Sequence, residues 1–449
     1  MPLLLATDAL VWLLVAATIG YVVYCRRHAH LKSAWHRVFQ SRAAMASITV
    51  LLGFAFIGLL DSLHFRPALA EQAKDAKAAY STEVLSLLDV SFARLRGRGE
   101  KTYSAPLATR SYAKEQVELP EGKHAREFPR LRFGGSHLKD ESEWAGDVAS
   151  KALAGLGLAI VLTPVLWLCF RGLRRLAPSI PWNASLTALL VFLFLLCPAL
   201  VLSVGYHVFG TDKVGQDIFY LAFKSIRTSI VIGTLTTMIL LPVGIALGMM
   251  AGYFKGWVDD VIQYVYTTLA SIPGILLIAA SVLMINVYLD RNADLFPTAA
   301  QRADIKLLAL CIILGFTSWT GLARLLRGET LKVSELEYVQ AAHAFGVARA
   351  RVLARHVLPN ISHLVIIILA LDFSGFVLAE AVLSYVGVGV DPSTNSFGTM
   401  INAARLEMSR EPVVWWALTT AFVFMLSLVL AANLFADAVR DGFDPRVRI

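Results

Sequence analysis

Two acidic residues interrupt a long apolar stretch in the last quarter of the chain. Asp372 and Glu380 are the only Asp, Glu, Lys or Arg residues within 361–389. A charged side chain at the centre of a membrane costs roughly 3 kcal/mol, so such residues commonly mark a substrate path or a proton relay. Because they are eight positions apart, both lie on roughly one face of a helix. They could line a pathway or pair with a cation of a partner subunit, and Glu380 could equally be hydrated near the end of its span.

The motifs of common hydrolytic and nucleotide-binding sites are absent from the sequence. It contains no Gly-x-x-x-x-Gly-Lys-Ser/Thr phosphate loop, no nucleophile elbow and no His-Glu-x-x-His zinc motif. His28 and His30 have a spacing that suits a metal, but no third ligand accompanies them. The cysteines also lack metal-ligand spacing; they are Cys25, Cys169, Cys197 and Cys311. We therefore expect neither an enzyme nor a metal site in this chain.

The composition is that of a membrane protein. The chain has 449 residues, of which 57% are hydrophobic and 16% charged, whereas soluble domains carry roughly 25% charged residues. A membrane-spanning helix needs about 20 mostly apolar residues. The candidate spans are 4–24, 45–61, 151–170, 185–207, 228–252, 261–287, 304–325, 361–389 and 412–436. The sequence thus predicts an all-α polytopic bundle of about nine transmembrane helices, of which 45–61 is the shortest.

Basic residues in the loops predict the orientation of the chain. The loops after the first, third and seventh spans are rich in Lys and Arg, and with nine spans all three fall on one side of the membrane. Since positive loops stay in the cytoplasm, we expect the N-terminus outside and the C-terminus in the cytoplasm. The net charge of +8 follows from the same bias, so nucleic acid is not an expected partner. No basic region precedes the apolar run at 3–24, which favours a retained helix over a cleaved signal.

The polar segment 62–149 falls on the outer side in this topology. Its acidic and basic residues are nearly equal in number, and its length is enough for a small domain. The stretch 94–101 is expected to be an exposed loop. The segment contains no chemical motif, so a structural cap and a binding role both remain open.

The loop between the seventh and eighth spans is expected to form two short helices. Ser334 could cap the first of them, with Glu337 three residues later as the partner in a capping box. Ala341 and Ala342 keep that helix thin, so that another surface can approach it closely. Gly346 permits the turn between the helices. Because an amphipathic hairpin can occur in any helical bundle, the pattern alone does not establish a function.

Residues 334–360 of this loop resemble the coupling loop of the permease subunits of ABC importers. The family pattern is Glu-Ala-Ala, three residues, Gly, and about nine residues later a short hydrophobic stretch ending in Pro. The matching positions are Gln340, Ala341, Ala342, Gly346, His356, Leu358 and Pro359. Gln340 replaces the usual Glu, which would weaken one electrostatic contact and leave the small-residue surface intact. In the family this loop docks into a groove on the ATPase subunit, and the resemblance implies that role here.

A second stretch resembles the outer-face motif of the di/oligopeptide branch of these permeases, Gly-Thr-Asp-x-x-Gly-Arg-Asp. Its matching residues are Gly210, Thr211, Asp212, Gly215 and Asp217, with Gln216 in place of Arg. Thr211 or Asp212 could cap a short interfacial helix, and Lys224 could lie at the headgroup level or pair with Asp217. Residues 378–400 and 434–446 are also similar to family patterns in the expected order.

The resemblance covers about residues 185–449 and implies a six-helix core of the type I importer fold. Residues 1–61 would be additional helices, 62–149 an extracytoplasmic segment, and 150–184 a third additional helix with its loop. The implied role is a permease subunit in the bacterial inner membrane, forming half of a pathway for peptides or related small solutes. The implied partners are a second permease subunit, two ATPase subunits that carry ATP and Mg²⁺, and a solute-binding protein. The second permease subunit is expected to be a different chain, and the sequence leaves a second copy of this chain open. The permease itself would bind no cofactor.

Two other classes of protein remain open from the residues alone. A secondary transporter or channel could use Asp372 and Glu380 and would need no ATPase. A membrane anchor could instead serve the segment 62–149. The sequence does not indicate the cargo, because in this family a separate binding protein usually sets specificity.

Overall fold

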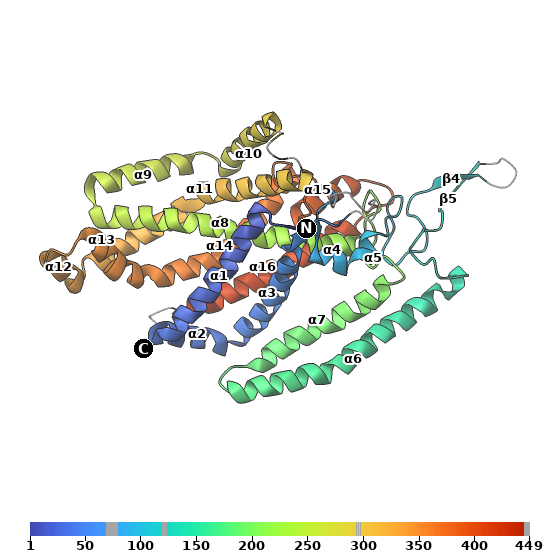
Figure 1. Ribbon diagram of the computed structural model, residues 1–449, viewed down its shortest axis with the longest axis horizontal. Coiled ribbons are helices and arrows are strands. Elements are labelled where there is room, and N and C mark those ends of the chain that lie inside the picture. The colour runs from blue at the N-terminus through green and yellow to red at the C-terminus, as the bar shows by residue number, and fades with distance from the viewer. Residues whose placement is uncertain (69–79, 119–123, 293, 295, 297, 444–449) are drawn as a thin grey trace, which may run out of the picture. The chain divides into compact units, whose positions relative to one another are not determined.

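The computed structural model describes residues 1–68, 80–118, 124–292, 294, 296 and 298–443 (Figure 1). Within them, nine helical stretches are long and apolar enough to cross a membrane, which confirms the predicted bundle. They are Ala6–Arg27, Arg42–Asp61, Glu141–Leu176, Trp182–Ser203, Ile218–Phe254, Gly274–Arg291, Ala299–Ser334, Arg349–Val386 and Trp416–Phe443. Of the residues 434–446, which resemble the C-terminal pattern of the family, 434–443 are described and 444–446 lie outside the described residues.

By its contacts the chain divides into two compact units, each of which is described by itself. Unit 1 comprises Met1–Leu4, Phe39–Thr228 and Thr394–Ala431. Unit 2 comprises Leu5–Val38, Ser229–Ser393 and Ala432–Ile449. The long helices α8 (Ile218–Phe254) and α16 (Trp416–Phe443) contribute residues to both. The division into additional helices before residue 185 and a permease core after it stays a prediction.

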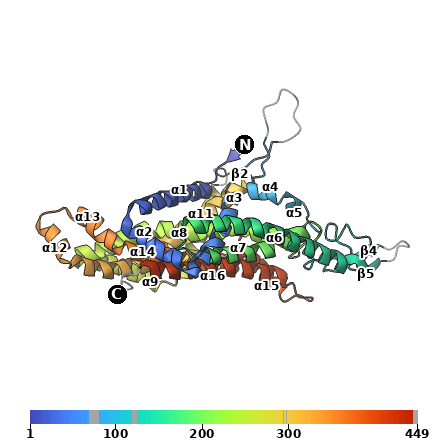
Figure 2. The same ribbon diagram turned by 90° about the horizontal axis from the view of Figure 1, so that it is seen from below.

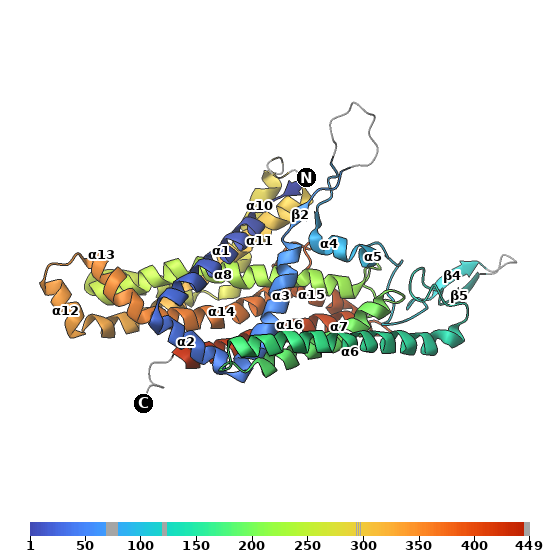
Figure 3. The ribbon, with the colours of Figure 1, turned by 60° about the horizontal axis from the view of Figure 1, so that its bottom comes forward.

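Unit 1 contains three membrane helices, which are α3 (Arg42–Asp61), α6 (Trp144–Leu176) and α7 (Trp182–Ser203). α6 and α7 lie side by side along much of their length (Figure 3). A Cβ on Gly155 would lie 2.4 Å from the Cα of Pro198, so a small residue is needed where these two helices meet. α3 packs on α7, where the Ser185 hydroxyl donates to the Met45 carbonyl at 3.0 Å.

Short elements build the part of unit 1 outside these helices. They are β1 (Pro2–Leu3), β2 (His64–Phe65), β3 (Leu85–Ser86), α4 (Leu87–Ser91), α5 (Ala93–Arg96), β4 (Glu115–Glu118), β5 (His124–Glu127), a 3-10 turn (Glu141–Glu143) and α15 (Phe397–Glu407). β1, β2 and β3 form an antiparallel sheet in which Pro2 pairs with Phe65. β4 and β5 pair separately and extend beyond the start of α6 (Figure 1). The loop expected at 94–101 is wrong in its first part, because Ala93–Arg96 is helical.

An aromatic cluster connects the segment 62–149 to the helices of unit 1. The Phe92 ring lies 6.1 Å from that of Phe219 and 5.3 Å from that of Phe223, centroid to centroid, and both partners belong to α8. Phe424 of α16 extends the cluster, with its ring 5.6 Å from Phe223 and 6.3 Å from Phe397. Each such pair contributes about 1 kcal/mol beyond its buried area. The segment is therefore packed onto unit 1 through apolar contacts as well as polar ones.

Unit 2 is almost entirely helical. Its elements are α1 (Ala6–Arg27), α2 (Ala29–Gln40), α9 (Gly256–Ser271), α10 (Gly274–Arg291), α11 (Ala299–Ser334), α12 (Glu337–Ala344), α13 (Arg349–Val352) and α14 (Leu358–Val386), with parts of α8 and α16. α1 docks on α11 through Thr7, whose backbone N–H donates to the buried Asp304 carboxylate at 3.1 Å. The Trp35 ring of α2 lies 5.3 Å from the Phe443 ring of α16. The additional N-terminal helices are thus packed directly on helices that carry the family resemblance.

Three glycines on α8 bring it into close contact with α11. Gly244, Gly248 and Gly252 are spaced four residues apart and are here called the glycine seam. A Cβ at any of them would lie 2.7–2.8 Å from an atom of α11, including the backbone carbonyls of Ala323 and Arg327. Small residues at this spacing let helix backbones approach where no side chains intervene.

The span expected at 261–287 is wrong as a single helix. The chain instead forms α9 and α10, with a break at Ile272 and Pro273. Ile272 is extended, with a ψ of 130°, because the ring of a following proline disfavours the helical conformation. Only α10 of this pair is apolar and long enough to cross a membrane by itself.

Candidate functional site

The loop that resembles a coupling loop lies at the ends of α11 and α14 in unit 2 (Figure 2). α12 and α13 are its two predicted short helices, and a π-helical turn at Leu353–Val357 continues into α14. Gly346 between the helices has a φ of +75°, a conformation that glycine adopts without steric cost. Its N–H donates to the His343 carbonyl at 3.0 Å and so closes the end of α12.

The predicted capping box at the start of α12 is wrong. α12 begins at Glu337 and its N-cap is Leu336, which has no polar side chain to cap the helix. Ser334 is the last residue of α11, and its hydroxyl donates to the Leu331 carbonyl at 2.8 Å. The serine is therefore used at the end of one helix and not at the start of the next.

The surface of α12 combines small residues with one large exposed aromatic side chain. Ala341 is exposed and Ala342 is half-buried, whereas Val339 faces the interior of unit 2 and is buried. Phe345 directly precedes the turn glycine and is 87% exposed. The sequence reasoning missed Phe345, although an aromatic residue between an alanine-rich helix and a turn glycine was the available signal. The exposed surface of α12 thus presents Phe345 and small alanines among the polar side chains of Glu337, Gln340 and His343.

Hydrogen bonds connect α12 to the start of α14. The Asn360 amide donates to the Tyr338 hydroxyl at 2.9 Å and to the His356 carbonyl at 2.6 Å. The Tyr338 and His356 rings lie 6.0 Å apart. α14 begins at Leu358, directly after the π-helical turn, and Pro359 lies in its first turn. A displacement of α12 would therefore reach α14 through Tyr338 and Asn360.

Gln340 stands where the family pattern has Glu, and its contact with Glu335 explains why an amide suits this position. Its Nε2 donates to the Glu335 carboxylate at 3.3 Å and to the Glu335 carbonyl at 3.2 Å. Glu335 in turn pairs with Lys255 at 2.6 Å. A glutamate at 340 would face Glu335 with the same charge, so the amide suits this position.

The outer-face motif forms a tight turn against the segment 62–149 in unit 1. Gly210 has a φ of +73° and Gly215 a φ of +76°. A Cβ on Gly210 would lie 2.4 Å from the Ser104 carbonyl oxygen, and one on Gly215 would lie 1.9 Å from the Glu100 carbonyl oxygen. Both glycines are thus required by backbone conformation and by the close approach of the segment.

Side chains of the motif continue this contact. The Ser104 N–H donates to the Thr211 hydroxyl at 2.7 Å, and this hydroxyl donates to the Thr102 carbonyl at 3.0 Å. The Asp212 carboxylate accepts from the Gln216 N–H at 2.7 Å and closes the turn. The predicted short helix capped by Thr211 or Asp212 is therefore wrong: the described chain makes a turn here and enters α8 directly.

Asp217 belongs to a buried cluster of three ionisable groups. Nδ1 of His207 lies 2.7 Å from the Asp217 carboxylate, and Nε2 lies 3.3 Å from the Glu100 carboxylate. Glu100 also accepts from the backbone N–H groups of Arg132, Phe133 and Gly134 at 2.8–3.1 Å. Burial alone would lower the pKa of His207, but Asp217 and Glu100 raise it to about 9. Burial would raise the pKa of Glu100, but the bonds from His207 and these N–H groups lower it to about 2.

These pKa shifts predict how the attachment of the segment depends on pH. His207 titrates above its ordinary value of 6.5, so its stabilisation is complete below pH 6.5 and is lost as pH rises through 9. Glu100 titrates below its ordinary value of 4.5, so its stabilisation is complete above pH 4.5 and is lost as pH falls through 2. We expect the thermal midpoint of the purified chain to be highest between about pH 4.5 and 6.5 and to decline toward pH 9. The variant His207→Gln should have a lower midpoint and a flatter profile above pH 6.5; an unchanged slope would contradict the assignment.

Lys224 pairs with the segment and not with Asp217, which corrects the sequence prediction. Its ammonium lies 2.7 Å from the Asp61 carboxylate and 3.0 Å from the Asp89 carboxylate. Asp89 also accepts from the Tyr220 hydroxyl at 2.6 Å. Burial acts to raise the pKa of Asp89, but Lys224 and these hydrogen bonds lower it below its ordinary value. Lys224 thus attaches α8 to both α3 and the segment.

The two acids of the eighth span differ in their surroundings. Glu380 is fully buried and accepts from the Ser384 hydroxyl at 2.7 Å, so the interpretation that it is hydrated at the end of the span is wrong. The same hydroxyl accepts from the Val390 N–H at 3.3 Å. Asp372 is half-buried. A pathway or pairing role for the two acids stays a prediction.

The structure gathers the predicted site residues into two groups. The coupling-loop residues lie together in unit 2, as do Asp372 and Glu380 on α14, whereas the outer-face motif lies in unit 1. No group of three or more His, Cys, Asp or Glu side chains that could hold a metal occurs in the described part of the chain.

Comparison with known proteins identifies the family. The model of the family described as binding-protein-dependent transport system inner membrane component matches residues 244–449. The chain is 32% identical over 242 residues to the oligopeptide transport system permease protein OppC of Mycobacterium tuberculosis, covering 54% of this chain and 77% of that protein. The chain belongs to this family of transport permeases. It is a multi-pass inner-membrane subunit of an ATP-driven importer.

Other relatives of this binding-protein-dependent permease show similar coverage. The OppC protein of Haemophilus influenzae is 29% identical over 244 residues, which cover 54% of this chain and 72% of the relative. The glutathione transport system permease protein GsiD of Pectobacterium atrosepticum is 30% identical over 242 residues, which cover 54% and 73%. The family match contains the whole coupling loop, whereas the segment 62–149 lies outside it. Membership therefore supports import over the secondary-transporter and anchor interpretations.

Proposed function

We propose that this permease forms half of a translocation pathway and that a second, different permease subunit forms the other half. Two cytoplasmic ATPase subunits dock on the coupling loop, and ATP with Mg²⁺ is bound and hydrolysed on them. A solute-binding protein delivers cargo at the outer face. The N-terminus is outside and the C-terminus is in the cytoplasm, the orientation that keeps the basic loops inside. The names of the relatives specify oligopeptides and glutathione, and peptides or related small solutes are the proposed cargo here.

The exposed Phe345 at the end of α12 supports this proposal most directly. Phe345 caps the C-terminal end of α12 and is 87% exposed, and burying a phenylalanine contributes roughly 2–3 kcal/mol. The small side chains of Ala341 and Ala342 let a groove on a partner reach the helix backbone. A central aromatic anchor among small residues is the usual arrangement of an energetically dominant contact.

The contacts of α12 also support a route for force into the membrane helices. When the ATPase subunits close on ATP, they push α12. Tyr338 and Asn360 pass the displacement to the start of α14, and the glycine seam lets α8 and α11 move as a closely packed pair. The helices then rock between inward-open and outward-open arrangements, a rigid-body form of alternating access.

Phe345→Asp is expected to remove the ATPase subunits from the complex. The change replaces an apolar anchor by a charge that would have to be desolvated in the groove, so ATPase recovery should fall at least tenfold. The measurement is affinity purification of the tagged permease from native membranes in mild detergent, with companions quantified by mass spectrometry. Phe128→Asp is the matched control, since Phe128 is also exposed but lies on the segment 62–149. Equal ATPase recovery with Phe345→Asp would overturn the docking role.

A further inference from the structure

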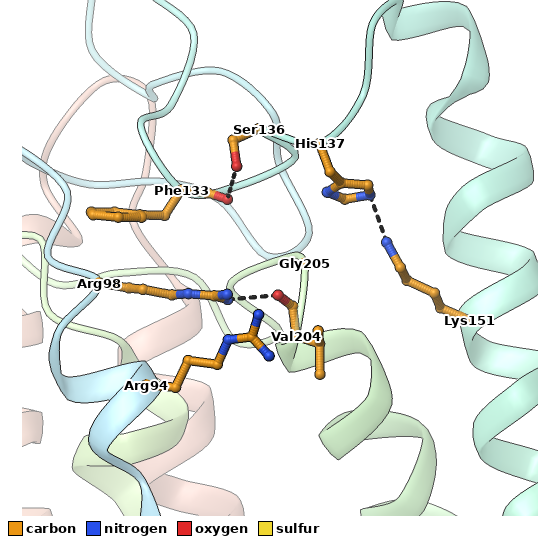
Figure 4. A pocket seen from close by; sticks show the side chains of 8 residues that line it. All are labelled: Arg94, Arg98, Phe133, Ser136, His137, Lys151, Val204 and Gly205. Carbon is orange, nitrogen blue, oxygen red and sulfur yellow. Dashed lines mark hydrogen bonds between the residues drawn. The ribbon is translucent and has the colours of Figure 1, made fainter.

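A cavity of about 260 Å³ lies in unit 1 beside the end of α7 and the first turns of α6 (Figure 4). Its lining residues are Arg94, Arg98, Phe133, Ser136, His137, Lys151, Val204 and Gly205. A water molecule takes about 30 Å³ of liquid volume, so the cavity has room for a phosphate group together with a few waters. Four of the lining side chains are basic and none is acidic.

Two arginines on one side of the cavity face each other without an acid between them. Nη1 of Arg98 donates to the Ser203 and Val204 carbonyls at 3.1 and 2.7 Å. Arg94 is exposed and makes no hydrogen bond or ion pair with any residue that the structure describes. Burial and the charge of Arg94 lower the pKa of Arg98, and the charge of Asp217 offsets this only in part. This mutual repulsion would be relieved by an anion.

The opposite side of the cavity is also basic, and its two basic side chains share one carboxylate. Lys151 and His137 both bond to one oxygen of Asp147, at 2.6 and 2.7 Å, and the Tyr206 hydroxyl donates to the same oxygen at 2.7 Å. Among the described residues, Asp147 is the only acid that bonds to a side chain lining the cavity. Nε2 of His137 also lies 2.5 Å from the Lys151 ammonium (Figure 4), so this carboxylate is shared between the two basic groups on its own side of the cavity.

The position of Lys151 places the cavity at the membrane surface. Lys151 and Arg171 both lie on α6, and 20 residues of helix span roughly 30 Å, the thickness of the hydrocarbon core. Between these two basic residues, α6 presents exposed apolar side chains, which include Leu153, Leu158, Ile160, Val161 and Val165. Lys151 therefore lies at the headgroup level, and the exposed apolar side chains of α6 begin two residues after it at Leu153.

We propose that this cavity binds the phosphate group of an anionic phospholipid in the leaflet next to the segment 62–149. Arg94 and Arg98 hold the phosphate from one side and Lys151 from the other, while the acyl chains lie along α6. The segment is thereby attached to the bilayer as well as to the permease helices. This inference does not depend on the proposed docking of ATPase subunits.

The test is selective retention of lipid by the full-length permease. The purified protein is equilibrated with detergent micelles that contain equal amounts of phosphatidylglycerol and phosphatidylcholine, and bound lipid is counted by native mass spectrometry. We expect wild type to retain phosphatidylglycerol selectively, and Arg94→Glu to reduce that selectivity at least tenfold. Arg94 makes no bond that folding would lose, so this variant should keep the wild-type thermal midpoint. Arg96→Gln is the matched control, because Arg96 lies on the same helix, pairs with Glu83 and does not line the cavity.

Unchanged selectivity in Arg94→Glu, or an equal loss in Arg96→Gln, would overturn the site. Titration with inorganic phosphate alone, followed by calorimetry, separates the two sources of the anion. Millimolar or weaker binding of free phosphate with retained phosphatidylglycerol selectivity supports the lipid. Tight phosphate binding that depends on Arg94, without lipid selectivity, would overturn the lipid assignment and leave a site for a soluble phosphate.

Discussion

Gly346→Val is expected to reduce substrate uptake at least tenfold while the assembled ATPase subunits continue to hydrolyse ATP. The φ of +75° at Gly346 is disfavoured by more than 1 kcal/mol for a residue with a side chain, and most strongly for a β-branched one. A Cβ at this position would meet no atom within 4 Å, so the effect comes from the backbone and not from a clash. The turn between α12 and α13 would change, and force from the ATPase would no longer reach α14. Uptake per ATP hydrolysed in proteoliposomes measures this directly.

Gly387→Val provides the matched control for that experiment. Gly387 also has a positive φ, +88°, and open space around its Cβ position, but it ends α14 far along the chain from the coupling loop. The variant should carry a similar backbone cost and keep the wild-type ratio of uptake to hydrolysis. If Gly346→Val transports like wild type, the turn has no part in coupling.

Glu100→Gln is expected to lower the free energy that holds the segment 62–149 in place by about 3 kcal/mol. The buried carboxylate accepts from three backbone N–H groups and interacts with His207. Removing the negative charge of a buried carboxylate that is hydrogen-bonded in this way is among the more destabilising substitutions. The NH₂ group of the new glutamine side chain would face either the Arg132 N–H or His207. Since two donors repel each other, at least one hydrogen bond would be replaced by a repulsive contact. Hydrogen exchange at residues 132–134 should accelerate by roughly 100-fold, because about 1.4 kcal/mol corresponds to a factor of ten.

The control for this prediction is Glu143→Gln. Glu143 is exposed in the turn before α6, so the same chemical change should alter exchange less than twofold. Protection at 132–134 that survives Glu100→Gln would show that other contacts, such as those of Thr211 with Thr102 and Ser104, suffice to hold the segment.

Features that depend on local sequence were predictable. The spans follow from the length of their apolar runs, and even the short one at 45–61 is a full helix because its flanking residues continue it. The turn at Gly346 was predictable because few other residues adopt its conformation. The break at Pro273 did not follow from the proline alone, because Pro164, Pro198 and Pro242 lie inside α6, α7 and α8.

Features that depend on distant residues were not predictable from one sequence. Glu100 and His207 are 107 positions apart, and neither belongs to a recognisable motif. The cavity draws Arg94 from a stretch expected to be an exposed loop, and Lys151 from the first turns of a span. Periodicity reports which face of one element is apolar, but it contains no information on which loop folds onto which helix. The outer-face motif was found by resemblance, yet its contact with the segment 62–149 could be seen only in the structure.

The glycine seam between α8 and α11 has a mechanical consequence. Where side chains interdigitate, helices can slide only by changing many rotamers at once, so their contacts resist small shifts. At Gly248 and Gly252 the backbone of α8 lies against the Ala323 and Arg327 carbonyls of α11, and at Gly244 the Leu322 side chain fills the place of the missing Cβ. The seam therefore holds α8 and α11 at a short, fixed separation, so that the two helices respond to an applied force as one unit. A larger residue at Gly248 would force the two helices apart, because even its Cβ would lie 2.8 Å from the Ala323 carbonyl oxygen.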